Sequence, residues 1–125
     1  MYNILVVDDE IRIRSLIRKY AEFEGHTVTE AGDGMEAVHL CRVNTYDIII
    51  MDVMMPELDG LAATRAIRGM DRPDAQLPII AMTANLFDED VAACLAAGMD
   101  AHIPKPLEAG QMIRTIAEWL ERKKQ

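Results

Sequence analysis

The sequence predicts a three-layer α/β domain, in which helices cover both faces of a parallel sheet. Short apolar runs alternate five times with stretches in which apolar residues recur at helical spacing. Three of these runs are apolar at consecutive positions, which is typical of strands covered on both faces. Because parallel neighbours cannot be joined by a tight hairpin, each connection needs a crossover, and the intervening helices supply it.

The expected strands are the runs ILVV (residues 4–7), TVTEA (27–31), IIIM (48–51) and PIIAM (78–82), with a short fifth strand near residues 101–103. Glycines and prolines mark the connections between them. Gly25 follows the first helical stretch, Gly98 follows the fourth, and Pro73 and Pro78 enclose a polar loop. At 125 residues, the chain is expected to form one domain over residues 1–125.

Each expected helix has a stripe of apolar residues three or four positions apart, which would face the sheet. The fourth helix is expected from about residue 87 to residue 97. The stripes are Ile13, Leu16, Ile17, Tyr20 and Phe23; Ala37, Val38 and Cys41; Ala63 and Ile67; Phe87, Val91, Cys94 and Leu95; and Ile113, Ile116, Ala117 and Leu120.

Composition excludes several classes of function. The net charge of −8, from 21 acidic and 13 basic residues, argues against binding to nucleic acid. No apolar run reaches the roughly 18 to 20 residues that a membrane span needs, and no signal segment follows Met1. We therefore expect a cytoplasmic protein that does not bind membranes. Cys41 and Cys94 lack metal-site spacing and are expected to pack in the core.

Polar residues gather where the expected strands end. Asp8 and Asp9, with Glu10, follow the first strand, and Asp52 follows the third. Thr83 follows the fourth strand and Lys105 the fifth. In an open parallel sheet the functional crevice lies beyond the carboxyl ends of the strands, so these groups should converge on one edge.

Each of these residues also has a purely structural interpretation. Asp9 could cap a helix, Asp52 and Thr83 could cap turns, and Lys105 could be a solvated loop residue. Together, however, three aspartates at one edge would repel one another unless a cation or raised pKa values relieved them. Mg²⁺ suits such an oxygen-rich site and leaves positions for phosphate oxygens. With the lysine and the threonine beside it, Asp52 would then be the nucleophile that accepts a phosphoryl group.

Four segments together resemble the receiver (CheY-like) domains of two-component response regulators. They are ILVVDDE, IIIMDVMMPELDG, IIAMTAN and IPKPL, which are similar to that family's acidic pair, phosphoacceptor strand, hydroxyl-bearing strand and lysine-proline motif, in the same order. The resemblance covers essentially the whole chain. It implies a doubly wound, flavodoxin-like fold with strand order 2-1-3-4-5 and five helices. It also implies a phosphoryl donor, which is a phosphohistidine on a histidine kinase or a histidine phosphotransfer domain.

The resemblance assigns roles to particular residues. It implies phosphorylation of Asp52, with Mg²⁺, or Mn²⁺ in its place, held by Asp8, Asp9, Asp52 and the backbone carbonyl of Met54. Asp8 would act mainly through water. Thr83 and Lys105 would contact the phosphoryl oxygens. The peptide bond before Pro106 would be cis.

The resemblance further implies a conformational switch. Thr83 would move toward the phosphoryl group while a residue on the fifth strand turns inward. That residue is His102, where the family more often has tyrosine or phenylalanine. An imidazole there would make activation depend on pH near neutrality, which is a hypothesis.

The two parts of the chain resemble different receivers. Residues up to Gly60 resemble receivers joined to DNA-binding output domains, whereas AATRAIR, IIAMTAN and GMDAHIPKPL resemble receivers of hybrid histidine kinases. Ile11 and Ser15 are candidates for contact with the phosphoryl donor. Met112 and Trp119 are candidates for a face of the fourth helix, fifth strand and fifth helix, where family members dimerise or bind outputs.

Three other functions fit the sequence less well. An aspartyl phosphatase would need a second acid two residues after its nucleophile, and that position is Met54. An FMN-binding protein would need hydrogen-bond donors after the first strand, where the sequence has DDE. A receiver that acts without phosphorylation would be expected to lack one of the required groups. We therefore expect a phosphoacceptor with only self-catalysed phosphotransfer and autodephosphorylation, and not an enzyme in the usual sense.

Overall fold

The computed structural model describes residues 2–55, 58–71, 76–83, 88–105 and 107–123. Five parallel strands form one sheet in the order β2-β1-β3-β4-β5, as the resemblance implied. The elements, in chain order, are β1 (Asn3–Val7), α1 (Ile11–Phe23), β2 (Thr27–Ala31), α2 (Gly34–Val43), β3 (Ile48–Asp52), α3 (Gly60–Arg68), β4 (Ile79–Thr83), α4 (Asp88–Ala97), β5 (Ala101–Pro104) and α5 (Ala109–Lys123).

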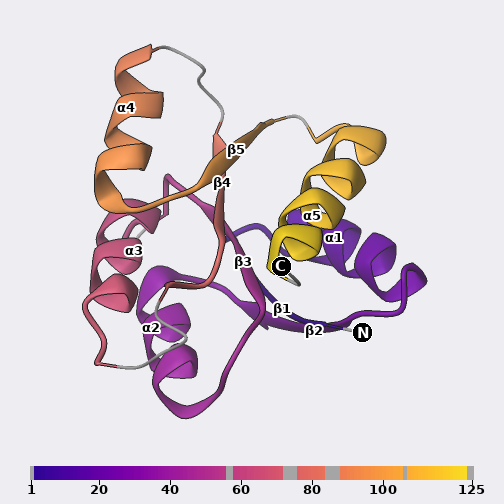
Figure 1. Ribbon diagram of the computed structural model, residues 1–125, viewed down its shortest axis with the longest axis horizontal. Coiled ribbons are helices and arrows are strands. Elements are labelled where there is room, and N and C mark those ends of the chain that lie inside the picture. Colours follow the sequence, from indigo (N-terminus) through magenta and orange to yellow (C-terminus); the bar gives the residue numbers. More distant parts are fainter. Residues whose placement is uncertain (1, 56–57, 72–75, 84–87, 106, 124–125) are drawn as a thin grey trace.

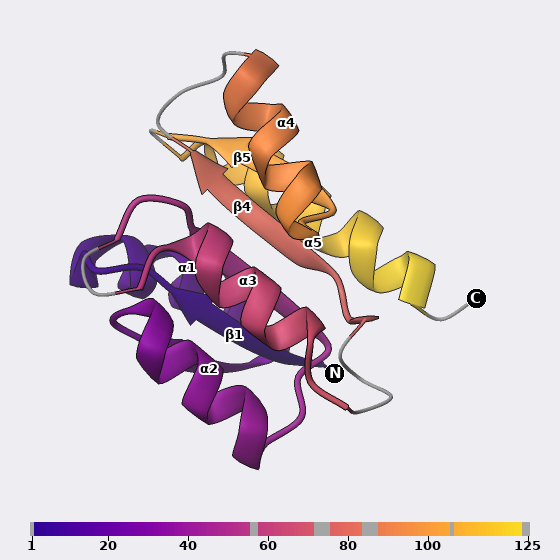
Figure 2. The same cartoon turned by 90° about the vertical axis from the view of Figure 1, so that its left-hand side faces the viewer.

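The three-layer prediction is confirmed. Helices α1 and α5 cover one face of the sheet, and α2, α3 and α4 cover the other (Figures 1 and 2). A hydrophobic cluster fills each interface: Ile17 and Ile116 belong to the first, and Val38 and Ile67 to the second. Strands β3 and β4 are buried at every position, because helices cover both of their faces.

The predicted strands agree with the observed ones to within one residue at each end. Two boundaries matter for function, since Asp52 and Thr83 are the last residues of β3 and β4 and not the residues that follow them. Asp52 is in register with Met82, and Thr83 with Pro104. The expected start of the fourth helix at residue 87 lies outside the described residues.

Three described residues of the expected apolar stripes are exposed, namely Phe23, Leu95 and Ala117. Phe23 is 86% exposed because it ends α1, just before the chain turns back at Gly25, whose φ of 91° favours glycine. Leu95 is 58% exposed, because the buried side of α4 is the one that carries Cys94 and Ala97, and Leu95 lies beside it. Both cysteines are buried, as predicted.

Two of the helix starts are capped by aspartate. Asp33 accepts a hydrogen bond from the Glu36 backbone N–H at the start of α2, and Asp59 accepts one from Ala62 at the start of α3. Within the described part of the chain, no helix has the length and apolar character to cross a membrane.

Candidate functional site

The carboxyl ends of four neighbouring strands carry the polar residues that the sequence predicted there. Strand β1 leads into Asp8, β3 ends at Asp52, β4 ends at Thr83 and β5 leads into Lys105. Among the described residues, Asp8, Asp52 and Thr83 are three of the four buried polar side chains. Burying polar groups is costly unless they are paired, so their gathering at one edge indicates a site and not a packing solution.

Lys105 connects the two buried carboxylates. Its Nζ lies 3.0 Å from Oδ2 of Asp8 and 3.3 Å from Oδ2 of Asp52. Its side chain is only 17% exposed, so it is not the solvated loop lysine of the structural interpretation. The loop that carries it is fixed by the Lys105 backbone N–H, which donates to the carbonyl oxygen of Thr83 at 2.7 Å.

The charges at this edge shift one another's pKa values. Burial, and then the neighbouring carboxylate of Asp8, raise the pKa of Asp52 to about 6, although Lys105 and a hydrogen bond from the Met54 backbone act in the opposite direction. Burial also disfavours the charged form of Lys105, but its contacts with the two carboxylates outweigh this and raise its pKa. Lys105 therefore stays positively charged. Its charge does not fully offset the effects of burial and of Asp8 on the pKa of Asp52.

A cluster of carboxylates lies in the loop after β1. One oxygen from each of Asp8, Asp9 and Glu10 lies within 4.8 Å of the others; Asp8 is buried, and the other two are exposed. The Glu10 backbone N–H donates to Oδ1 of Asp8 at 2.9 Å, which fixes that side chain. The N-cap residue of α1 is Glu10, whose side chain makes no capping hydrogen bond. Asp9 is not at the N-cap position, so the alternative in which it caps this helix is wrong.

These residues fit a hard divalent cation. The donors are carboxylate oxygens, which Mg²⁺ prefers. Oδ2 of Asp8 is buried, and its partner among the described residues is Nζ of Lys105 at 3.0 Å. Oγ1 of Thr83 is buried without a hydrogen-bond partner in the described part of the chain. An oxygen acceptor and a hydroxyl donor are thus both available to a ligand.

Sequence reasoning did not assign a metal-binding role to Glu10. It was noted at the end of the first strand, and its position next to the aspartate pair was the available signal. Met54 lies in the loop two residues after Asp52 with its side chain 77% exposed, so any contribution to a metal site would come from its backbone. The peptide bond before Pro106 lies outside the described residues.

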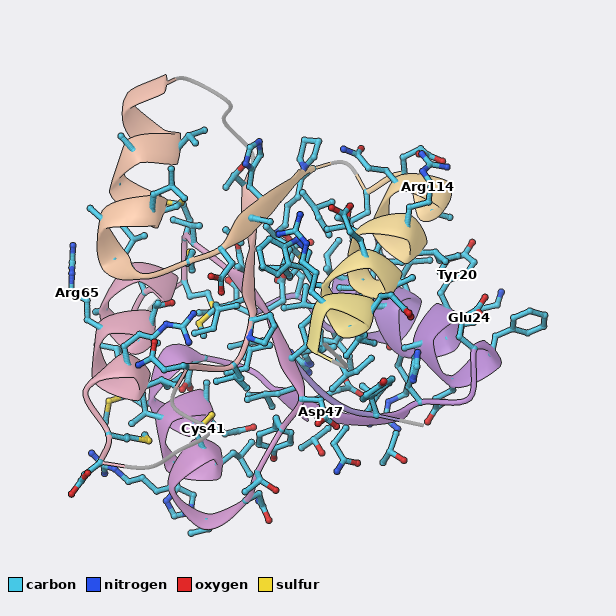
Figure 3. The ribbon with its side chains drawn as sticks, in the orientation of Figure 1. Tyr20, Glu24, Cys41, Asp47, Arg65 and Arg114 are labelled. Atoms are coloured by element: carbon cyan, nitrogen blue, oxygen red, sulfur yellow. The ribbon has the colours of Figure 1, made fainter. Side chains whose placement is uncertain are left out.

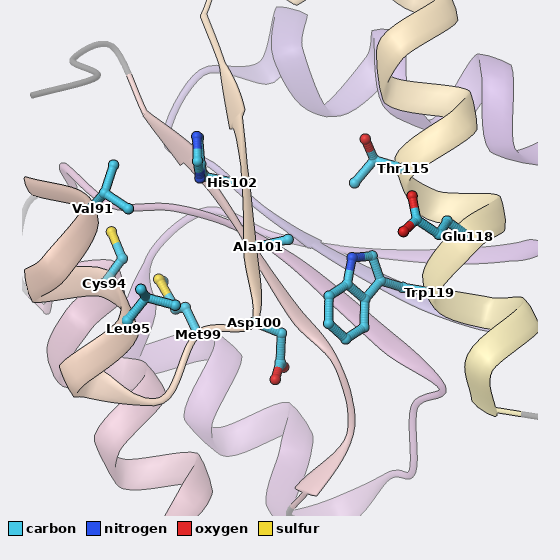
Figure 4. Close-up of a pocket in the computed structure, with 10 residues that line it drawn as sticks. All are labelled: Val91, Cys94, Leu95, Met99, Asp100, Ala101, His102, Thr115, Glu118 and Trp119. Atoms are coloured by element: carbon cyan, nitrogen blue, oxygen red, sulfur yellow. The ribbon is translucent and has the colours of Figure 1, made fainter. Parts of the chain in front are cut away.

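The remaining predicted residues lie on other surfaces. His102 is exposed on β5 and, with Trp119 of α5 and Val91 of α4, lines an open cavity of about 430 Å³ (Figure 4). The expectation for Met112 is wrong, because this residue is fully buried against the sheet in the cluster shared with α1. Ile11, on α1, is 65% exposed and lies off the core stripe, as expected.

Comparison with known proteins agrees with this geometry. Residues 4–117 match the family model of the response regulator receiver domain. The chain is 37% identical over 122 residues to the response regulator MprA of Mycobacterium tuberculosis, covering 98% of this chain and 52% of that protein. It is 33% identical over 147 residues to probable histidine kinase 1 of Oryza sativa subsp. indica, covering 94% of this chain and 15% of that protein. The chain therefore spans about half, or less, of these relatives.

Solved structures give the same result. The receiver domain of a sensor histidine kinase from Pseudomonas aeruginosa, described with a magnesium ion coordinated in its active-site cleft, is 36% identical with a TM-score of 0.87, covering 96% of this chain and 98% of that one. The receiver domain of the Francisella response regulator 1452 is 31% identical with a TM-score of 0.89, covering 98% of this chain and 99% of the other. Response regulators and receiver domains of histidine kinases thus both occur among the relatives.

Proposed function

The chain belongs to the response regulator receiver domain family, and from that premise we propose that Asp52 is the residue that accepts the phosphoryl group. The observation that carries this assignment is the contact of one lysine with two buried carboxylates, at 3.0 and 3.3 Å. Asp52 is held at the end of a fully buried strand, so its carboxylate has a fixed direction of attack. Asp8, which directly follows the neighbouring strand β1, serves the cation instead.

Receiver domains bind Mg²⁺ in an acidic pocket, and the pocket of this chain has the donors for it. We assign the ion to Asp8, Asp9, Asp52 and the backbone carbonyl of Met54, with Asp8 acting mainly through water; Mn²⁺ is an alternative ion. When bound, the ion supplies positive charge that offsets carboxylate repulsion and the charge of phosphoryl oxygens. Glu10 is an additional oxygen donor at the exposed side of the same cluster.

The proposed reaction transfers a phosphoryl group between two side chains. An Oδ atom of ionised Asp52 attacks the phosphorus of a phosphohistidine, a phosphorus–oxygen bond forms, and the phosphorus–nitrogen bond breaks. The donor imidazole leaves with the bonding electron pair. Lys105 places its ammonium beside the oxygens of the transferred group, and the buried hydroxyl of Thr83 donates a hydrogen bond to one of them.

Receiver domains interact with histidine kinases or phosphotransfer proteins and with output domains. For this chain we assign the donor contact to the edge that holds Asp52, with Ile11 and Ser15 of α1 beside it. The proposed switch pairs Thr83 with His102, and the cavity of α4, β5 and α5 is the proposed output or dimer face. Such a domain would work in the cytoplasm, and its acidic surface gives it no role in binding nucleic acid.

The test is intact-mass analysis after treatment with acetyl phosphate, with Mg²⁺ and with a chelator. We expect one phosphate adduct on the wild-type chain that requires Mg²⁺ and is lost in Asp52→Asn. Asp59→Asn is the matched control, because Asp59 is an exposed N-cap residue at the start of α3, after the loop that follows Asp52, and asparagine still caps there. An adduct that persists in Asp52→Asn would refute the assignment.

A further inference from the structure

Arg14 of α1 is attached to the loop that carries the acidic cluster. One of its terminal nitrogens, Nη1, donates to the backbone carbonyl of Asp8 at 2.7 Å. The side chain is only 17% exposed, although its length and charge would allow it to extend into solvent. The Arg14 backbone N–H donates to the carbonyl of Glu10 at 3.3 Å as part of the first turn of α1, so the contact with Asp8 is the one that depends on the arginine side chain.

The guanidinium is itself held in place. Its Nε donates to Oε1 of Glu30 at 3.0 Å, and Arg18, one helical turn further along α1, donates from its own Nε to the other oxygen of Glu30 at 2.6 Å. Glu30 lies on β2, where its strand pairs with β1. Because Glu30 and Glu22 together offset the charges of Arg14 and Arg18, the effect of Arg14 on the acidic loop is mainly to fix its position.

The backbone of Asp8 is thereby held from two sides. Its N–H donates to the carbonyl of Ala31, the last residue of β2, at 3.2 Å, and its carbonyl accepts from Arg14. Among the described contacts, the bond from Arg14 is the only one that the peptide between Asp8 and Asp9 receives from outside the loop. Without it, this peptide would have no such partner. That peptide sets the directions in which the two aspartate side chains leave the chain.

We propose that Arg14 is a positioning residue for magnesium binding, which acts by holding the Asp8 carbonyl and so orienting Asp8 and Asp9 toward a shared ion. The inference rests on the proposed function above, since it takes the acidic cluster as the magnesium site. Outer partners that orient metal ligands typically change metal affinity about 10- to 100-fold when removed. Arg14 has the geometry of such a partner, except that it contacts the backbone carbonyl of Asp8 and not the Asp8 carboxylate.

The matched control is on the same helix. Arg18 shares Glu30 with Arg14, but its other backbone contact is the Val28 carbonyl on β2, at 3.2 Å, and not the acidic loop. Arg18→Ala therefore removes a comparable ion pair without releasing Asp8. Arg14→Lys keeps a charge and a donor but cannot bond Asp8 and Glu30 together in the same way.

The experiment is calorimetric titration of the metal-free chain with Mg²⁺, alongside thermal unfolding of each variant in a chelator. We expect the Kd for Mg²⁺ to rise about 10-fold in Arg14→Ala, less in Arg14→Lys, and less than twofold in Arg18→Ala. The rate of adduct formation from acetyl phosphate should return to near the wild-type value in Arg14→Ala at saturating Mg²⁺. Glu30→Gln, which loosens Arg14 without removing it, should give an intermediate Kd even if Arg14→Ala does not fold.

The outcomes separate this inference from the assignment of Asp52. If Arg14→Ala and Glu30→Gln bind Mg²⁺ as the wild type does, or if Arg18→Ala weakens binding equally, Arg14 has no positioning role, while the proposed function stands. If the wild-type chain binds no Mg²⁺, both proposals fail. A rate that stays low in Arg14→Ala at saturating Mg²⁺ would also contradict the inference, because it would place the defect in the phosphotransfer step.

Discussion

Gly60, the first residue of α3, packs directly against the backbone carbonyl oxygen of Asp52. A Cβ atom at Gly60 would overlap that oxygen and would lie 3.0 Å from Cα of Val53. The Gly60 N–H donates to the Val53 carbonyl at 3.0 Å, so α3 begins against the end of β3. A residue without a side chain is therefore needed where the helix meets the proposed phosphoacceptor.

Gly60→Ala should disturb the backbone that carries Asp52. Because the clash is with backbone atoms, the strand end or the start of α3 must shift, at a cost of about 1–3 kcal/mol in the free energy of unfolding. Adduct formation from acetyl phosphate should slow as well. Gly69→Ala, at the other end of α3, is the control, because its nearest contact would be 3.4 Å away and its φ of −81° suits alanine. Equal unfolding midpoints for the two variants would contradict this prediction.

Lys105→Gln should raise the pKa of Asp52 above its present value of about 6, because the lysine is the largest of the influences that lower it. Carboxyl-carbon NMR titration in a chelator would measure the shift. Lys19→Gln, on the exposed face of α1, removes the same charge at a distance and should leave the Asp52 pKa unchanged. A titration curve for Asp52 that does not move in Lys105→Gln would mean that the ion pair does not persist in solution.

The raised pKa of Asp52 predicts a pH-dependent cost to stability. The carboxyl has a pKa of 3.8 in the unfolded chain and about 6 in the folded one, so the folded state holds its proton longer. The favourable contribution is fully present below pH 3.8 and is lost as the pH rises through 6. Ionised Asp52 then destabilises the metal-free fold.

Asp52→Asn should therefore be more stable than the wild type at pH 7 in a chelator, by about 1–2 kcal/mol after allowing for screening by solvent. The difference should vanish near pH 4, where the wild-type carboxyl is neutral. Chemical unfolding at several pH values would measure it, and Mg²⁺ should reduce the difference at pH 7. A wild-type chain that is more stable than Asp52→Asn at pH 7 without Mg²⁺ would contradict the sign.

The fold was predictable because each of its signals is local. The consecutive apolar runs are the buried strands, and Asp52 was recognisable because a carboxylate ends such a run. Parallel strand order then brings Asp8, Asp52 and Lys105 to one edge, which topology alone implies. The sequence could not show that one ammonium contacts both carboxylates, since that depends on how the loop after β5 bends back.

The expectations from the sequence that proved wrong concern how each helix is turned and placed on the sheet. Phe23 and Leu95 have the spacing of core residues, but periodicity does not show where the sheet stops beneath a helix. The seven-residue spacing of Met112 and Trp119 predicts one shared face of α5, but Met112 is buried in the cluster that α5 shares with α1. The bond between Arg14 and the Asp8 carbonyl links a side chain to a backbone atom, and no residue pattern marks it.

Arg68, the last residue of α3, joins segments that follow it in the chain. It donates to the Leu77 carbonyl at 2.6 Å and to the Gly98 carbonyl at 2.7 Å, and it pairs with Asp100 at 2.8 Å. Asp100 in turn accepts the Ile79 N–H at 2.9 Å. The guanidinium thus holds together the starts of β4 and β5, at the edge of the sheet opposite the carboxylate cluster.

Arg68→Ala should lower the free energy of unfolding by about 2–4 kcal/mol, because two partly buried carbonyls and one carboxylate lose a shared donor. Arg65→Ala on the same helix is the control, since Arg65 points away from the molecule (Figure 3). Chemical unfolding would compare the two variants. Arg68→Ala should also speed hydrogen exchange of the Ile79 and Asp100 amides, while the Mg²⁺ affinity changes less than twofold. A large loss of Mg²⁺ affinity would show instead that the two edges of the sheet are coupled.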